Sequence, residues 1–215
     1  MNILVFDTST DMLAVGVKKG DGDMKTSVES GFRHSETLLP AIERCLADAS
    51  IGLKDLGLIA CTSGPGSFTG LRIGISTAKG LSLALGLPWV GVPTLDCAAF
   101  GWEKPGRTVV PVLDARKNRI YAALYRNGQR VSEYLDVSLS ALLAAVDGEA
   151  EVSFVGPDAD LLSDYALERT GFRIEKDDPA MRLSGLANLA EIQFMKNGGA
   201  GELEGPLYLR EPEIG

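Results

Sequence analysis

Residues 64–74, with the sequence GPGSFTGLRIG, form the segment of this chain whose composition is best suited to chemistry. An apolar run over 56–63 precedes the segment, and a stretch with helical spacing over 69–86 follows it. A strand, a glycine-rich turn and a helix in this order collect backbone N–H groups at a helix N-terminus, where an anion is bound well. The segment lacks the lysine of the GxxxxGK[ST] loop and the spacing of the GxGxxG loop. Phosphate binding and a purely structural turn therefore both stay open.

Polar residues after the first apolar run, at 3–7, extend this candidate site. Their hydroxyl and N–H groups are suited to phosphate, but an Asp or Thr at the end of a strand also caps turns. The glycines of the loop equally permit positive φ in a tight turn. The predicted vicinity of a nucleotide or phosphate comprises Asp7, Thr8, Ser9, Gly64, Gly66 and Ser67.

Nucleophilic and general-base chemistry has weaker support. His34 is the single histidine and is either a general base or a polar residue at a helix start. Ser67 does not lie in GxSxG, because Pro65 and Thr69 occupy the places of the flanking glycines. Arg72 is suited to phosphate, to a carboxylate on a partner, or to structural pairing within the chain.

Metal binding through nitrogen and sulfur is excluded, because one histidine and three dispersed cysteines cannot build such a site. A carboxylate Mg²⁺ site around Asp7, Asp11 and Asp114 stays open, although we expect no metal. The cysteines lie in apolar stretches, which predicts buried free thiols and a reducing compartment; they are Cys45, Cys61 and Cys97.

The composition is that of a globular chain, since 45% of its 215 residues are hydrophobic and 23% are charged. The net charge of −8 argues against a stand-alone nucleic-acid binder, which needs clustered Lys and Arg. The N-terminal sequence lacks the basic region of a signal peptide, and no uncharged apolar run is long enough to span a bilayer. We therefore expect a cytoplasmic location.

The elements that must position these residues alternate between strand and helix. Ser35 is the expected N-cap of the first helix and Gly86 the expected C-cap of the second. WEKPGR, at 102–107, has the composition of a linker. Strands are expected at 3–7, 13–19, 23–30, 56–61, 88–92, within 110–124, within 128–138 and within 151–156, and helices at 36–49, 69–86, 139–146, 158–170 and 183–199.

An internal repeat divides the chain. VPVLDARKNRIYAAL at 110–124 repeats the plan of ILVFDTSTDMLAVGV at 3–17, with Asp114 in the place of Asp7. Both segments have an apolar strand that ends in aspartate, a polar turn and a returning apolar strand. The repeat predicts two related domains.

The helix expected at 69–86 is apolar nearly all round, which predicts cover on more than one side. Its small residues Gly70, Gly74 and Ala78 recur every four positions and allow another helix to approach closely, although its own sheet takes part of the helix. With the stripe of helix 36–49 beside it, the helix is a candidate partner interface. We expect charge introduced as Gly74→Glu or Leu81→Glu to block partner binding while leaving the fold intact. The predicted interface residues are Leu38, Leu39, Ile42, Leu46, Gly70, Gly74, Ala78, Leu81 and Leu85.

The repeated order of strand, hairpin, helix, strand and helix resembles the actin/sugar-kinase/Hsp70 superfamily, in which the first aspartate and its hairpin surround nucleotide phosphates. The motifs FDTST, RHSETLLP, TSGPGSFTGLRIG, AKGL, DARKNRIYAALY and PLYLR are similar to those of the TsaB family, also called YeaZ. The resemblance implies an α/β fold of two RNase H-like domains, at 1–104 and 105–215. Because the last helix is followed by an apolar tail, we also expect the helix or the tail to pack back on the first domain.

The same resemblance implies a function in forming N6-threonylcarbamoyladenosine (t6A) at position 37 of tRNAs that decode ANN codons. Such a protein is a non-catalytic scaffold for a catalytic paralogue, TsaD, and works with an ATPase, TsaE. Such a protein forms a homodimer when alone and contacts tRNA only through the complex. It has no cofactor of its own, and ATP or ADP is bound only at the interface of the complex. The metal-binding HxxxH of the paralogue corresponds here to Thr94 and Ala98, neither of which ligates a metal. The alternatives are a nucleotide-binding phosphotransferase or ATPase that uses Asp7, and, more remotely, a peptidase.

Overall fold

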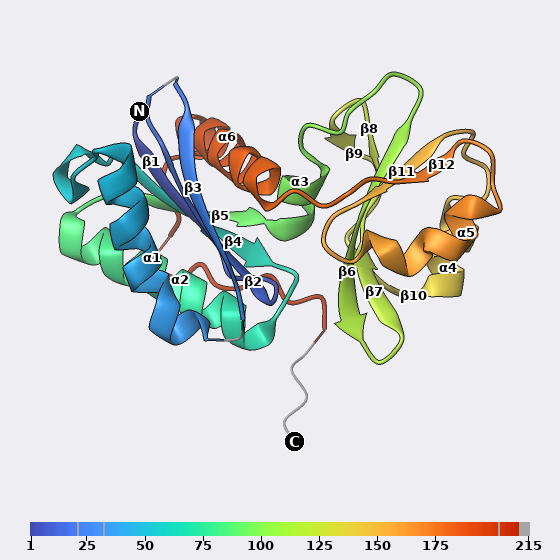
Figure 1. Cartoon of the computed structure of the whole chain (residues 1–215), viewed down its shortest axis with the longest axis horizontal. Coiled ribbons are helices and arrows are strands. Elements are labelled where there is room, and N and C mark those ends of the chain that lie inside the picture. The colour runs from blue at the N-terminus through green and yellow to red at the C-terminus, as the bar shows by residue number, and fades with distance from the viewer. Residues whose placement is uncertain (21, 32, 202, 211–215) are drawn as a thin grey trace.

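The computed structural model describes residues 1–20, 22–31, 33–201 and 203–210. Two β-sheets lie side by side, each with helices packed on it (Figure 1). The sheets are formed by the two parts of the chain in which the sequence repeat occurs.

The first sheet has the strand order β3-β2-β1-β4-β5. The first three strands form an antiparallel meander, and β4 and β5 are parallel to β1. All residues of the central strand β1 are buried, because helices cover both faces of the sheet. The strands are β1 (Ile3–Asp7), β2 (Met12–Lys18), β3 (Met24–Ser30), β4 (Leu58–Gly64) and β5 (Trp89–Pro93).

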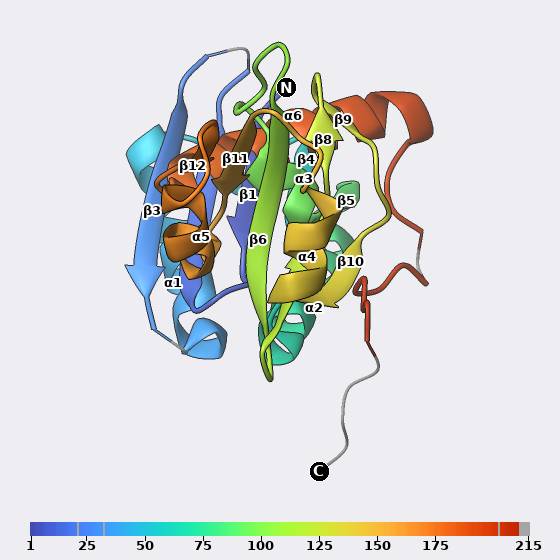
Figure 2. The same cartoon turned by 90° about the vertical axis from the view of Figure 1, so that its right-hand side faces the viewer.

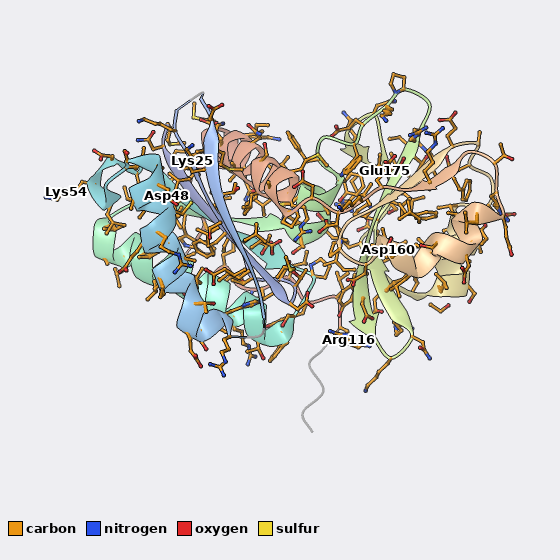
Figure 3. All side chains as sticks on the ribbon, in the orientation of Figure 1. Lys25, Asp48, Lys54, Arg116, Asp160 and Glu175 are labelled. Atoms are coloured by element: carbon orange, nitrogen blue, oxygen red, sulfur yellow. The ribbon has the colours of Figure 1, made fainter. Side chains whose placement is uncertain are left out.

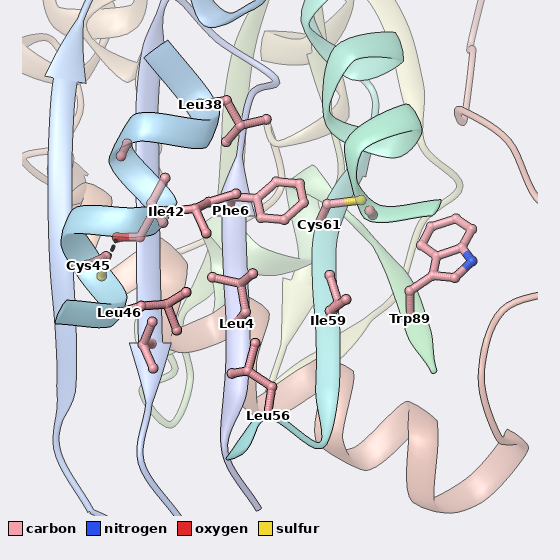
Figure 4. Packing of buried hydrophobic residues seen from close by; sticks show 14 of the residues in the cluster. Leu4, Phe6, Leu38, Ile42, Cys45, Leu46, Leu56, Ile59, Cys61 and Trp89 are labelled. Carbon is pink, nitrogen blue, oxygen red and sulfur yellow. Dashed lines mark hydrogen bonds between the residues drawn. The ribbon is translucent and has the colours of Figure 1, made fainter. Parts of the chain in front are cut away.

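Two pairs of helices cover this sheet. On one face, α1 (His34–Ala49) and α2 (Phe68–Leu85) pack on alternate residues of the strands, such as Leu4 and Phe6 (Figure 4). On the other face lie α3 (Thr94–Ala99) and α6 (Pro179–Asn197), and Leu183 and Leu186 of α6 join the core there. The short helix η1 (Leu53–Asp55) connects α1 to β4.

The second sheet repeats the first, with the order β10-β7-β6-β11-β12 and the same directions. The short strands β8 and β9 pair with each other, and β8 also pairs with β6 and so extends this sheet. Figure 2 shows the small helices on its outer face. The strands are β6 (Thr108–Arg116), β7 (Arg119–Ala122), β8 (Tyr125–Arg126), β9 (Gln129–Arg130), β10 (Leu135–Ser138), β11 (Val152–Val155) and β12 (Phe172–Ile174), and the helices are α4 (Leu139–Ala145), η2 (Ala159–Leu162) and α5 (Ser163–Leu167).

Several local expectations need correction. Ser35 lies inside α1, and the N-cap is Arg33 without a side-chain cap bond. The single helix expected at 158–170 is split into η2 and α5, and the strand expected within 128–138 is split into β9 and β10. Helix α3 was not predicted, because its six residues are too few for a helical period to show. Helix α6 starts earlier than expected, where Asp178 caps the N–H groups of Ala180 and Met181.

The segment after α6 returns along the first sheet. The N–H of Ala200 donates to O of Trp89, and the N–H of Leu207 donates to O of Ser63. The segment of residues 206–210 thereby reaches the glycine-rich loop. The acidic end of the tail, at 211–215, lies outside the described residues.

Candidate functional site

A cleft of about 710 Å³ lies between the two halves of the molecule. The glycine-rich loop and the start of α2 form one wall, and the β6–β7 hairpin forms the opposite wall. Arg116, labelled in Figure 3, lies at this hairpin. The lining residues are Ser9, Thr10, Asp11, His34, Gly66, Ser67, Phe68, Thr69, Gly70, Ile73, Leu113, Asp114, Ala115, Arg116, Lys117, Tyr121, Asp158, Tyr208 and Arg210.

The loop is held rigidly against the end of β1. The N–H of Ser67 donates to O of Ser9 over 2.7 Å, and the hydroxyl of Ser67 caps α2 by accepting from the N–H of Gly70. Gly70 and Gly74 press on Thr8, since a Cβ built at Gly70 would collide with the carbonyl oxygen of Thr8. The loop is therefore a tight structural turn that also borders the cleft.

Asp7 is turned away from the cleft. Its Oδ1 accepts from the N–H and hydroxyl of Ser9 and from the hydroxyl of Thr62, all within 2.9 Å. Its Oδ2 lies 3.5 Å from Nε of Arg182, and both side chains are only 3% exposed. Burial alone would lower the pKa of the Arg182 guanidinium, but the charges of Asp7 and Asp177 raise it above its usual value. The carboxylate of Asp7 is thus bound inside the protein by a permanent cation.

The opposite wall of the cleft carries the second-half aspartates. The N–H of Asp114 donates to Oδ2 of Asp158, and Asp114 itself pairs with Arg116 over 2.9 Å. Burial raises the pKa of the Asp158 carboxyl, and the nearby charges of Asp114 and Asp11 raise it further. This wall is polar: Asp114 is paired with Arg116, whereas Asp158 lies near the like charges of Asp114 and Asp11.

The structure separates the residues that the sequence grouped as the phosphate vicinity. Ser9, Gly66 and Ser67 line the cleft, whereas Asp7, Thr8 and Gly64 are buried behind it. His34 lines the cleft and contacts O of Thr10 through Nε2. Among the described residues, no hydrogen bond joins His34 to Ser67, so the relay of a serine peptidase is not assembled there.

The described residues contain no cluster of three or more His, Cys, Asp or Glu side chains that could hold a metal ion. Asp7 is buried beside Arg182, whereas Asp11 and Asp114 line the cleft, so the three do not form one site. Thr94 and Ala98 are both buried on α3. All three cysteines are free and buried, as the sequence predicted. No helix within the described ranges is long and apolar enough to cross a membrane.

Most residues of the predicted interface face inward. Six of them are buried in the first half: Leu38, Ile42, Leu46, Gly70, Gly74 and Ala78. Leu81 and Leu85 are half-buried against the same core, and Leu39 is 54% exposed. Gly70 and Gly74 are required by the close approach of Thr8, so this side of α2 cannot meet a partner while this fold is kept. The outer side of α2 instead presents Ser76, Gly80, Leu83 and Ala84.

Sequence reasoning missed several residues that join the two halves. On the side away from the cleft, Asp96 of α3 accepts hydrogen bonds from the phenols of Tyr125 and Tyr134. Tyr208 and Arg210 of the tail line the cleft. Within the first half, Arg182 of the returning helix α6 holds Asp7, and this partner was missed as well. The tail motif PLYLR is visible in the sequence, but no local pattern assigns its partners, which lie far away along the chain.

The Asp96 cluster predicts a loss of stability at alkaline pH. Burial, followed by the charge and hydrogen bond of Asp96, raises the pKa of both Tyr125 and Tyr134. Above about pH 10 an unfolded chain loses these protons while the folded chain keeps them. Their contribution to stability is therefore fully present below that pH and falls as the pH rises. Urea unfolding at increasing pH measures this slope, and Tyr125→Phe/Tyr134→Phe should flatten it. Ionisation of every phenol near about pH 10 in a chain with native circular dichroism would contradict the expectation.

Comparison with known proteins agrees with this architecture. A family model described as TsaD, tRNA N6-adenosine threonylcarbamoyltransferase, matches residues 29–198. The chain is 39% identical over 132 residues to the tRNA threonylcarbamoyladenosine biosynthesis protein TsaB of Escherichia coli, covering 60% of this chain and 57% of that protein. It is 30% identical to TsaB of Bacillus subtilis, covering 75% of this chain and 73% of that protein.

Solved structures extend the likeness to the whole fold. YeaZ from Pseudomonas aeruginosa superimposes with a TM-score of 0.79 at 24% identity, over 97% of this chain and 99% of that one. An activator of 2-hydroxyisocaproyl-CoA dehydratase from Clostridium difficile gives a TM-score of 0.62 at 11% identity, over 91% and 96% of the two chains. The predicted fold of two RNase H-like domains of the actin/sugar-kinase/Hsp70 type is confirmed. With the family model over most of its length and two TsaB proteins among its relatives, the chain belongs to the TsaB (YeaZ) family.

Proposed function

We propose that this protein takes part in forming t6A at position 37 of ANN-decoding tRNAs, as a non-catalytic subunit that binds and supports a TsaD-type paralogue. The names of its relatives support the pathway. A TsaE-type ATPase completes the proposed complex, tRNA is reached through the paralogue, and ATP or ADP binds only at the joint surface. We also propose that the chain divides into two domains, at residues 1–104 and 105–215.

The observation that carries the scaffold role is the uncovered outer side of the α1/α2 layer. Leu83 of α2 is 87% exposed and Leu39 of α1 is 54% exposed. On the same side of α2, the exposed residues Ser76, Gly80 and Ala84 are small, and a Cβ at Gly80 would meet nothing within 4 Å. Small residues beside exposed leucines allow a second helix to pack closely. The proposed partners of this layer are the paralogue and, in its absence, a second copy of this chain.

The burial of Asp7 supports a non-catalytic role. A phosphotransferase that used this carboxylate would need it at the cleft, where it could orient a nucleophile or a metal. Within the described part of the chain, its hydrogen bonds and ion pair are with Ser9, Thr62 and Arg182. Turning it outward would leave the buried guanidinium without this partner.

Charge on the outer side of α2 is expected to weaken partner binding without harming the fold. Leu83→Glu should weaken the affinity for the paralogue by at least about tenfold, because an unpaired carboxylate would be buried at the interface. Titration calorimetry with the purified paralogue measures the affinity, and sedimentation measures the homodimer.

Leu167→Glu is the matched control, since Leu167 is 86% exposed but lies on α5 in the other half. Both variants should unfold at the wild-type temperature. Equal affinities for Leu83→Glu and the wild type would refute this interface. Full t6A formation by the paralogue and ATPase without this chain would refute the function itself.

A further inference from the structure

The two halves of the molecule are joined on one side and open on the other. Both chain crossings, at 100–107 and at 175–178, pass beside α3 and α6 (Figure 1). The buried Tyr125 and the half-buried Tyr134 hold Asp96 on this side. The cleft lies at the ends of β1 and β6, away from these crossings.

The tail residues 206–210, which we call the strap, cross the open side. At its first end, the N–H of Leu207 donates to O of Ser63 over 2.7 Å. At its other end, Nη2 of Arg210 donates to O of Ala115 over 2.8 Å, and its charge lies beside the phenol of Tyr121. The strap therefore ties the first sheet to the β6–β7 hairpin of the second.

An aromatic and cationic stack holds the middle of the strap. The ring centroids of Tyr208 and Phe68 lie 5.0 Å apart. The guanidinium of Arg72 lies over the ring of Phe68, 3.7 Å from its centroid. Nε of Arg72 also donates to the hydroxyl of Tyr208 over 3.1 Å. These contacts are half-exposed or exposed, and the described strap residues belong to no helix or strand. Segments held in this way open at a much lower free energy than core strands.

We propose that the strap is a releasable latch, which closes the cleft by joining its two walls and opens by letting go at Tyr208 and Arg210 together. Both side chains line the cleft, so release of the strap removes part of its wall. The crossings and the Asp96 cluster stay in place during release and act as the hinge. This device does not depend on the proposed function or on any partner.

A thiol placed under the latch tests the proposal. Ala115 is 4% exposed, lines the cleft and accepts the bond from Arg210, so Ala115→Cys reports opening through its reaction with a thiol reagent. The three native cysteines are free and buried, so we expect them to react only on global unfolding and to serve as an internal control. In this background, Tyr208→Ala should speed labelling of position 115 about tenfold, because it removes the stack and one hydrogen bond.

Tyr208→Ala is the decisive variant, because it acts on the first half while the reporter lies on the second. Arg210→Ala should give a similar increase, and Leu203→Ala, at a residue of the same tail that is 99% exposed, should give none. Acceleration by Arg210→Ala alone would overturn the latch, as would labelling of position 115 only together with the native cysteines.

A second measurement avoids the new cysteine. Trypsin cuts after Arg210, so its rate of cleavage there reports release of the strap in the otherwise native chain. Tyr208→Ala should raise this rate by about tenfold, with a weak dependence on urea that marks local opening. Cleavage with the urea dependence of global unfolding would show that the strap is a fixed part of the core.

Discussion

Replacing Arg182 with methionine is expected to lower the free energy of unfolding by about 3–5 kcal/mol, because it leaves the buried carboxylate of Asp7 without a counter-charge. Arg182 is 3% exposed and bridges Asp7 at the end of β1 to Asp177 before α6. The same guanidinium therefore pins the returning helix to the first sheet. Urea unfolding followed by circular dichroism measures the loss.

Two further variants show that charge, not shape, causes the loss. Asp7→Asn combined with Arg182→Met removes both charges and should recover a large part of the stability. Arg44→Met breaks an exposed pair with Glu29 and should change the free energy by less than about 1 kcal/mol. If Arg182→Met were no more harmful than Arg44→Met, Arg182 would not hold α6 in place.

Replacing Gly70 with alanine is expected to destabilise the chain by about 3 kcal/mol, although alanine favours a helix. The added Cβ would collide with the carbonyl oxygen of Thr8, which is backbone and cannot rotate away. Either β1 or α2 must then shift, and both belong to the core of the first half. Thermal and urea unfolding measure the effect.

Gly80→Ala in the same helix is the matched control. A Cβ there meets nothing within 4 Å, so this variant should gain about 0.5–1 kcal/mol. Equal effects at the two glycines would mean that Thr8 does not approach α2 closely. The same geometry corrects the expectation that Gly74→Glu leaves the fold intact. A side chain at Gly74 meets the hydroxyl of Thr8 inside the first half, so we now expect this variant to unfold the protein.

Local patterns predicted most of the elements. Alternating and continuous apolar runs placed β1, β2, β6 and β11, and helical stripes placed α1 and α2. Of the two predicted caps, Gly86 ends α2, whereas Ser35 does not cap α1. The repeated strand, aspartate and hairpin also predicted two related sheets, which share one strand order. The short helix α3 was not predicted, because six residues do not contain a measurable period, and η2 and α5 were predicted as one helix at 158–170.

The sequence by itself therefore determined the fold class, the repeat and the glycine-rich turn, since each depends on neighbours along the chain. Only the tertiary structure decided which side of α2 is free, because Thr8 and Gly70 are distant in sequence and approach each other only when β1 and α2 pack. The partner of Asp7 was hidden for the same reason, as Arg182 lies 175 positions further along the chain. The position of Asp7 at the end of the first strand suggested a role in phosphate binding. Its carboxylate is instead paired inside the protein with Arg182, which the returning helix α6 brings to it.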